Sequence, residues 1–218
     1  MAELITGLDA ARVRGNVERV REEIADAGRD PAEVEVLAAV KYVALEELGV
    51  LAAAGITTVG ENRAQELEAK AAAWAGRADF TWDFIGHLQS RKVRRILPLV
   101  RYVHSVGSES VLRELAKHAT PDTEVLVEVN VAGEEGKSGF APAELDEVLA
   151  RAPVRVAGLM TMPPLADRAE DSRRWFAALA ELAGRHGLRE LSMGTSQDFA
   201  VAVQEGATIV RIGTRLYR

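Results

Sequence analysis

The chain has 218 residues and no cysteine, so it contains neither a disulfide nor thiolate chemistry, which fits a reducing compartment. Its 33 acidic and 27 basic residues give a formal net charge of -6, which argues against a dedicated nucleic-acid binder. No stretch approaches the roughly 18 consecutive apolar residues that span a membrane, and residues 1–4 lack the basic start of a secretory signal. We therefore expect a cytoplasmic globular protein.

Apolar residues recur at helical spacing from Leu4 to Ile24, and Gly28 with Pro31 ends this pattern, so residues 1–30 are predicted to form an amino-terminal helix. From residue 34 onward, apolar runs rich in β-branched residues alternate with stretches of helical spacing. The predicted strands cover residues 34–41, 57–62, 80–87, 102–107, 124–131, 154–162, 191–194 and 208–213. The predicted helices between them cover residues 45–54, a stretch that ends at Trp74, and residues 91–97, 109–118, 142–150, 172–186 and 198–205.

Eight strands separated by seven helices predict a closed parallel (β/α)8 TIM barrel over residues 34–213, within a single domain of residues 1–218. An open doubly wound sheet is the alternative. A complete barrel usually ends in a helix that covers its last strand, and few residues follow strand eight here. We therefore expect the amino-terminal helix to cover part of the exterior or the base of the barrel.

Lys41 stands at the end of the first predicted strand, where the functional site of a barrel lies. A lysine amine that is partly removed from water is a nucleophile toward an aldehyde. A lysine at a strand end also commonly extends its amine into solvent. The position of Lys41 alone leaves both interpretations open.

The loop after strand seven has the composition of an anion site. Gly194 permits a tight turn, and Thr195 or Ser196 is expected to cap the helix that follows. The free amides at such a helix start favour a phosphate. A simple helix cap explains the same residues, so this loop is not diagnostic alone.

The loop after strand eight strengthens the functional interpretation. Arg211 is expected to point inward near the rim, which is costly unless it meets a ligand or a carboxylate. Gly213 and Thr214 add two amides and a hydroxyl. The loops after strands seven and eight form the standard phosphate site of these barrels, and here they lie opposite Lys41.

Other polar residues are predicted at the same rim. Asn62 ends strand two, and His87 ends strand three, where it suits either a general acid or base or a hydrogen-bonded structural role. The four histidines have no HxH or HExxH spacing, so no metal site is expected. Gly136-Lys137-Ser138 resembles the end of a nucleotide P-loop, but Val131 stands where that motif needs glycine. Residues 130 and 134–139 are instead predicted to form a polar flap over the barrel mouth.

Several blocks of sequence occur in an order and spacing that are specific when taken together. They are Ala39-Val40-Lys41, Gly60-Glu61-Asn62 with Gln65-Glu66, Phe84-Ile85-Gly86-His87-Leu88-Gln89, Val129-Asn130 with Lys137-Ser138-Gly139, Gly158-Leu159-Met160-Thr161-Met162, Leu191-Ser192-Met193-Gly194 with Ser196 and Asp198, and Val210-Arg211-Ile212-Gly213-Thr214. In these blocks the chain resembles the pyridoxal-phosphate homeostasis protein family, also called the pyridoxal-phosphate-binding protein family. The resemblance implies a fold-type-III barrel similar to the amino-terminal domain of alanine racemase. It also implies pyridoxal 5'-phosphate (PLP) held as an internal aldimine on Lys41.

The resemblance assigns further roles to individual residues. It implies that the phosphate of PLP is bound by Ser196, Gly213 and Thr214. It implies that Arg211 is the partner of the pyridine nitrogen and that Asn62 lies near the ring.

The chain departs from the family pattern in three places. Asp83 stands where the family often has histidine, and Tyr42 where it often has threonine, so both changes bear on the contacts beside the ring. The chain ends at Tyr217-Arg218, where phenylalanine-glycine and a short tail are usual. This last difference bears on the rim beside the expected phosphate site.

Three functions fit these residues. In the first, the protein is a monomeric PLP carrier in intracellular PLP homeostasis, with apo PLP-dependent enzymes as its partners and no catalytic residues. In the second, it is a fold-type-III racemase or related amino-acid enzyme, and in the third a cofactor-free aldolase that uses Lys41 as a Schiff base. Alanine racemases add a carboxyl-terminal β-domain whose tyrosine supplies one proton-transfer group, and no such domain follows strand eight. An arginine on the pyridine nitrogen also makes PLP a poorer electron sink, so the carrier is favoured.

Overall fold

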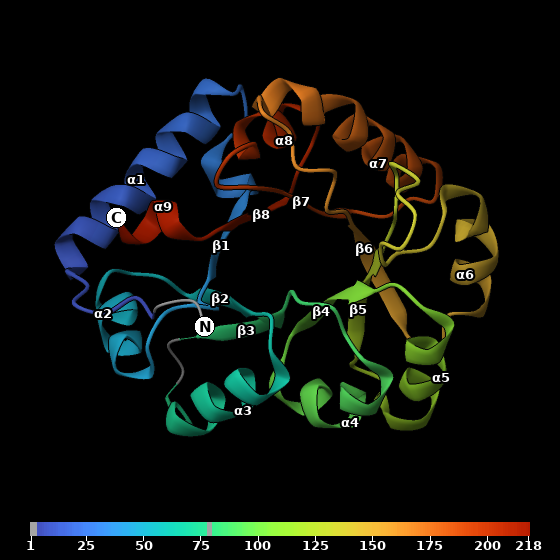
Figure 1. Cartoon of the computed structure of the whole chain (residues 1–218), viewed down its shortest axis with the longest axis horizontal. Helices are drawn as coiled ribbons and strands as arrows, with labels where there is room; N and C mark the ends of the chain where they lie inside the picture. The colour runs from blue at the N-terminus through green and yellow to red at the C-terminus, as the bar shows by residue number, and fades with distance from the viewer. Residues whose placement is uncertain (1–3, 78–79) are drawn as a thin grey trace.

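The computed structural model describes residues 4–77 and 80–218, and in these residues eight parallel strands close into a barrel in chain order (Figure 1). The strands are β1 (Glu35–Ala39), β2 (Thr58–Glu61), β3 (Thr81–Phe84), β4 (Tyr102–Val106), β5 (Glu124–Glu128), β6 (Arg155–Met160), β7 (Glu190–Thr195) and β8 (Ile209–Ile212). The barrel closes where β1 pairs with β8, from Glu35 opposite Ile209 to Ala38 opposite Ile212. The predicted barrel is confirmed, and the open doubly wound sheet is wrong.

Helices surround the barrel in the described residues, as Figure 1 shows. They are α1 (Ala10–Asp26), α2 (Leu48–Ala53), α3 (Ala64–Ala73), α4 (Val93–Ile96), α5 (Glu109–His118), α6 (Leu145–Arg151), α7 (Arg173–Arg185), α8 (Phe199–Gln204) and α9 (Thr214–Tyr217). Several are shorter than predicted because a 3₁₀ turn forms one end, as is common at helix termini. The 3₁₀ turns are η1 (Pro31–Glu33), η2 (Leu45–Glu47), η3 (Ser90–Lys92), η4 (Leu97–Leu99), η5 (Pro142–Glu144) and η6 (Ala169–Ser172). No helix among the described residues is long and apolar enough to cross a membrane.

The amino-terminal helix begins later than its apolar pattern predicts. The side chain of Asp9 caps α1 by accepting a hydrogen bond from the Arg12 amide at 2.7 Å, so the helix starts at Ala10. Leu4 and Leu8 precede this cap and are not helical, which corrects the prediction for the first residues.

The prediction that the amino-terminal helix covers part of the exterior is confirmed. α1 packs against α2, α8 and α9 on the outside of the barrel (Figure 1). The Asn16 amide on α1 donates hydrogen bonds of 2.9 Å to the carbonyls of Leu216 and Arg218. The short helix α9 was not predicted; it follows β8 and packs against α1.

The interior of the barrel is divided between apolar and polar side chains. Because successive residues of a strand point to opposite faces, alternate positions face inward. One small apolar cluster fills part of the interior and contains Leu37, Leu126, Met160 and Ile209. Buried polar side chains also come from the strands, among them Asp83, His104, Ser192 and Arg211. The larger apolar core lies between the strands and the helices.

Candidate functional site

A cavity of about 430 Å³ lies at the carboxyl ends of the strands. Its lining includes every residue that the sequence predicted to bind a ligand: Lys41, Asn62, Ser196, Arg211, Gly213 and Thr214. These residues come from four strand ends, those of β1, β2, β7 and β8, which the barrel brings together. The cavity is also lined by apolar and aromatic side chains, as binding sites for small organic molecules usually are.

Lys41 follows β1 rather than ending it. β1 ends at Ala39, two residues earlier than the expected lysine terminus, because the chain turns where the Val43 amide donates to the Val40 carbonyl at 3.0 Å. The Lys41 ammonium lies 5.3 Å from the centroid of the Tyr42 ring. Within the described residues, no carboxylate forms an ion pair with Lys41. The amine therefore lines the cavity without a charged partner.

A buried ion pair supports the strand ends behind Lys41. The Lys70 ammonium on α3 donates to the Val40 carbonyl at 2.6 Å and to the Glu61 carboxylate at 2.5 Å. The second oxygen of Glu61 accepts a hydrogen bond from the Asn62 amide at 2.9 Å. Glu61 precedes Asn62 in the chain, but its side chain points outward to α3 and is fully buried there. The pair fixes the backbone at the ends of two neighbouring strands, next to Lys41 and at Asn62, which both line the cavity.

Asn62 presents an unused acceptor. Its side-chain oxygen is buried and has no hydrogen-bond partner in the described structure. Gly86 packs on the Asn62 backbone so closely that a Cβ there would lie 2.1 Å from the Asn62 carbonyl oxygen. Asn62 is thereby held at the cavity wall, and an unpartnered buried oxygen is costly unless a ligand or water satisfies it.

The loops after β7 and β8 meet directly. The Gly213 amide donates to the Ser196 hydroxyl oxygen at 3.1 Å, so the two expected halves of the anion site lie side by side. Gly194 lies near the end of β7, where the register with β8 shifts, rather than in a turn after it. It has φ +88°, and a Cβ there would lie 2.9 Å from Phe199 Cα, so this position requires glycine. Thr214 is exposed at the cavity edge.

The predicted capping of α8 is wrong. Neither Thr195 nor Ser196 caps this helix, and Asp198 occupies the N-cap position without a side-chain cap bond. The Asp198 carboxylate instead accepts from the Thr195 amide at 2.7 Å and from its hydroxyl at 3.1 Å. The Ser196 hydroxyl takes no part in these bonds; it lines the cavity and accepts from the Gly213 amide.

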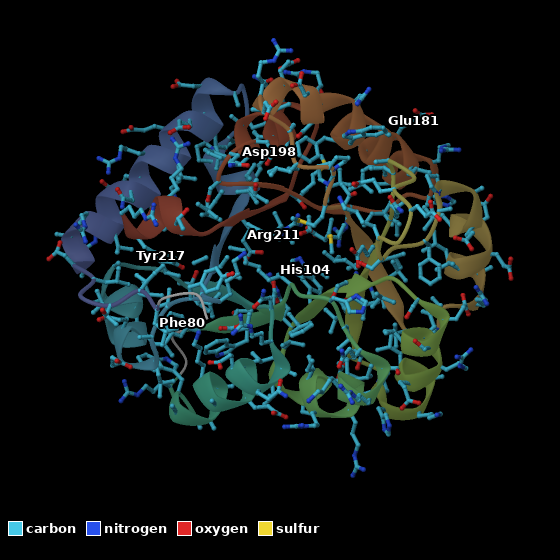
Figure 2. The ribbon with its side chains drawn as sticks, viewed as in Figure 1. Phe80, His104, Glu181, Asp198, Arg211 and Tyr217 are labelled. Atoms are coloured by element: carbon cyan, nitrogen blue, oxygen red, sulfur yellow. The ribbon has the colours of Figure 1, made fainter. Side chains whose placement is uncertain are left out.

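Arg211 enters the cavity floor from β8 and is almost fully buried (Figure 2). Its guanidinium donates to the Thr161 carbonyl at 2.9 Å and to the carbonyl and hydroxyl of Ser192 at 2.7 and 2.5 Å. Burial lowers its pKa to about 10, against the opposing charges of Asp198 and Glu128. The group stays charged at neutral pH, and within the described residues no carboxylate forms an ion pair with it.

Of the three positions that depart from the family pattern, two lie at the cavity and one does not. Tyr42 and Tyr217 line the cavity. Asp83 was expected beside the ring, but it does not line the cavity and lies inside the barrel, bonded to Arg101 and His104. His87 is exposed and outside the cavity lining, which argues against the first of the two roles considered for it, that of general acid or base.

The predicted flap is a compact loop anchored at the end of β5. The Asn130 amide donates to the Glu134 carbonyl at 2.9 Å and its oxygen accepts from the Glu134 amide at 3.1 Å. The Ser138 hydroxyl donates to Glu128 at 2.8 Å. These residues do not line the cavity, although Lys137 lines a neighbouring hollow that shares Met162 and Thr195.

One wall of the cavity was not predicted from the sequence. Ile5 lines it, because the segment before α1 pairs with the loop that carries Lys41: Ile5 donates from its amide to the Tyr42 carbonyl at 2.7 Å. The Glu47 carboxylate holds this segment by accepting from the Gly7 amide at 2.6 Å. Gly7 has a positive φ, which is incompatible with an α-helix, so this segment cannot continue α1.

Comparison with known proteins places this geometry among related chains. Residues 8–218 match the family model described as alanine racemase, N-terminal domain. A pyridoxal phosphate homeostasis protein of Aquifex aeolicus is 40% identical over 214 residues, which cover 92% of this chain and 93% of the relative. One from Pseudomonas aeruginosa is 41% identical over 209 residues, covering 91% and 90%.

Solved structures show the same fold. The structure of PipY from Synechococcus elongatus with PLP bound has a TM-score of 0.80 at 31% identity and covers 94% of this chain and 100% of its own. Alanine racemase from Corynebacterium glutamicum has a TM-score of 0.71 at 16% identity, with 99% of this chain and 63% of the racemase covered. The racemase similarity concerns the barrel fold alone.

Proposed function

Since this chain belongs to the family of pyridoxal phosphate homeostasis proteins, we propose that it binds PLP in the cavity at Lys41 and serves PLP homeostasis as a carrier with little or no catalysis. The observation that carries the proposal is the convergence of Lys41, the two joined anion loops and Arg211 on one cavity of about 430 Å³. The proposed recipients are apo PLP-dependent enzymes. The proposed state is a monomer in the cytoplasm, and size-exclusion chromatography with light scattering measures its mass.

The residues present fit PLP. Ser196, Gly213 and Thr214 would hold the phosphate, because the loops supply two hydroxyl groups and backbone amides at one edge of the cavity. The buried oxygen of Asn62 has no partner among the described residues and needs a polar group from a ligand or water. Bound PLP supplies an aldehyde that reacts with amines and a ring that withdraws electrons. The Lys41 amine would be its covalent attachment point.

Arg211 supports a carrier rather than an enzyme. Its guanidinium is charged at neutral pH, because burial lowers its pKa only to about 10. A positive charge beside the ring nitrogen disfavours a second positive charge there, so the nitrogen would stay unprotonated. An unprotonated ring withdraws electrons weakly, and carbanion chemistry on a bound amino acid would be slow.

The racemase alternative needs a second acid–base group. Two phenols line the cavity, those of Tyr42 and Tyr217, and Tyr217 is the buried one. Its hydroxyl donates to the Ala39 carbonyl at 3.2 Å. Burial, with a smaller effect of the Glu61 charge, raises the pKa of Tyr217 far above its ordinary value. A phenol held in this way is a poor base near neutral pH, so its environment favours the carrier. The aldolase alternative leaves the paired anion loops unexplained unless its substrate is a phosphate ester.

The attachment site is tested by borohydride reduction of the PLP-loaded protein followed by peptide mass mapping. We expect the pyridoxyl group on Lys41, and we expect Lys41→Ala to lose the absorbance band of the attached cofactor. Lys137→Ala is the matched control, because Lys137 is an exposed lysine near the cavity whose partner is Glu134. Labelling mainly at Lys137 would exclude the assignment.

The carrier role is tested separately. Loaded protein should reactivate an apo PLP-dependent enzyme, and chiral chromatography after long incubation should find no significant turnover of alanine. Robust racemisation that disappears in Lys41→Ala would replace the carrier by the racemase-like enzyme.

A further inference from the structure

A file of buried polar side chains crosses the barrel interior and ends at Arg211. Asp83 on β3, His104 on β4 and Ser192 on β7 are each fully buried, and none of them lines the cavity. His104 and Arg211 both lie within the ring of strands (Figure 2). Burying three polar groups in a barrel core costs free energy unless they form hydrogen bonds with one another.

The four residues form one continuous chain of hydrogen bonds. Asp83 Oδ2 lies 3.1 Å from His104 Nε2, and His104 Nδ1 lies 2.8 Å from the Ser192 hydroxyl oxygen. Arg211 donates to that hydroxyl oxygen at 2.5 Å. At the other end, the Arg101 guanidinium donates to Asp83 Oδ2 at 2.6 Å and to Glu35 at 2.7 and 3.0 Å.

The charges at the two ends determine which atom donates in each bond. Burial would raise the pKa of Asp83, but the hydrogen bond from His104 and the hydrogen bonds and charge of Arg101 outweigh it and hold the pKa below its ordinary value. Burial lowers the pKa of His104, and the charges of Arg211 and Arg101 lower it further against the effect of Asp83. At neutral pH the carboxylate is therefore charged and the imidazole is neutral.

A charged carboxylate only accepts hydrogen bonds, so Nε2 of His104 carries the ring proton and Nδ1 is the acceptor. The Ser192 hydroxyl must then donate to Nδ1. Its oxygen is left with lone pairs for Arg211, and the guanidinium donates to it. Every bond in the file thus has one permitted direction, which runs from Arg211 to Asp83.

We propose that Asp83, His104 and Ser192 are positioning residues that orient the Arg211 guanidinium toward the ring nitrogen of PLP. This inference rests on the proposed function, since it requires PLP in the cavity. Arg211 otherwise has only neutral partners among the described residues, in the carbonyls of Thr161 and Ser192 and the thioether of Met162. Of these contacts, only the hydrogen bond to the Ser192 hydroxyl has its donor and acceptor fixed by a distant carboxylate, that of Asp83. The Asp83 carboxylate, which can only accept, sets this direction.

Ser192→Ala tests the proposal, because it removes the hydroxyl and keeps the backbone carbonyl that also binds Arg211. The probes are PLP and 1-deaza-PLP, in which a CH group replaces the ring nitrogen. Both compounds carry the same aldehyde and phosphate, so the ratio of their dissociation constants isolates the contact between Arg211 and the ring nitrogen. We expect the preference for PLP over 1-deaza-PLP to fall about tenfold in Ser192→Ala, as the loss of one oriented charge-assisted hydrogen bond implies.

Ser172→Ala is the matched control. Ser172 is buried to a similar degree, 2% exposed, but ends η6 before α7 and bonds to none of the four residues. It should leave the preference unchanged. A general loosening of the barrel would weaken PLP and 1-deaza-PLP equally in Ser192→Ala, and that result, or an unchanged preference, would overturn the proposal.

A second pair of variants keeps the test decisive if Ser192→Ala folds poorly. His104→Leu removes the acceptor for Ser192, and His104→Asn offers a side-chain oxygen in place of Nδ1. We expect the preference to fall in His104→Leu and to recover at least in part in His104→Asn. The nitrogen resonance of ring-¹⁵N-labelled PLP gives an independent readout and should move toward its protonated position in His104→Leu. Failure of the wild-type protein to bind PLP would instead defeat the proposed function, and the inference with it.

Discussion

The buried Glu61–Lys70 pair permits the sharpest prediction about stability. The Glu61 carboxylate is fully buried and the Lys70 side chain is 4% exposed, so neither charge has water to replace a lost partner. Lys70→Met removes one charge at similar side-chain length and leaves Glu61 buried with only backbone donors. Removing one partner of a buried pair costs about 3–5 kcal/mol of unfolding free energy. For a protein of this size that corresponds to a fall in Tm of about 6–20 °C.

Urea unfolding and thermal melts measure this loss of unfolding free energy, and two further variants serve as controls. Arg151→Met breaks the exposed pair of Arg151 with Glu109, whose side chains are 42% and 45% exposed, and should cost no more than about 1 kcal/mol. Glu61→Leu combined with Lys70→Met removes both charges and should recover all but about 2 kcal/mol, because an apolar pair tolerates burial. If Lys70→Met costs no more than Arg151→Met, or the double variant shows no recovery, the reasoning is refuted.

Two further predictions concern the ligand and the pH. PLP should bind far more tightly than pyridoxal, because each charge-assisted hydrogen bond to the phosphate contributes about 1.5–3 kcal/mol of binding free energy. In a fluorescence titration, Ser196→Ala should reduce the difference in affinity between the two vitamers. Equal affinity of the wild-type protein for both vitamers would exclude a phosphate site. The pKa of His104 is lowered by burial, so the unfolded chain takes up a proton near pH 6.5 that the folded protein does not. The unfolding free energy should therefore fall as the pH drops below about 6.5, and a urea series should show a shallower decline in His104→Leu; an equal decline in that variant would contradict the reasoning. Stability should fall further below about pH 4, because the pKa of Asp83 is held below its ordinary value in the folded protein, so the unfolded chain takes up that proton first.

Local sequence information determined the elements themselves. α5 has the predicted bounds, Glu109–His118, because Ser108 caps it and its apolar face recurs at helical spacing. Alternation of strands and helices was enough to predict a parallel sheet, because short connections between parallel strands need a crossover helix. Lys41, Ser196 and Arg211 could be brought to one site on the same basis, since the carboxyl ends of parallel strands share one rim.

The first residues show where such local reasoning stops. Leu4 and Leu8 have the spacing of a helix face, and yet they precede the cap of α1. This segment is held by the Glu47 carboxylate, which accepts a hydrogen bond from the Leu8 amide at 3.0 Å. Glu47 lies 39 residues further along the chain. No periodic pattern within the segment contains that contact.

The interior of the barrel is the part that only the tertiary structure decided. Asp83, His104, Ser192 and Arg211 lie on four strands spread over the chain. Arg211 was expected to point inward, but nothing in any of these segments predicts that the four side chains contact one another. Whether two inward side chains meet depends on the tilt and the stagger of the strands when the sheet closes. Those quantities are set by the packing of the whole barrel, including the closure of β1 on β8. A residue's tendency to form a strand is encoded by its neighbours in sequence, whereas its partner across the barrel is chosen by closure, which involves every strand at once.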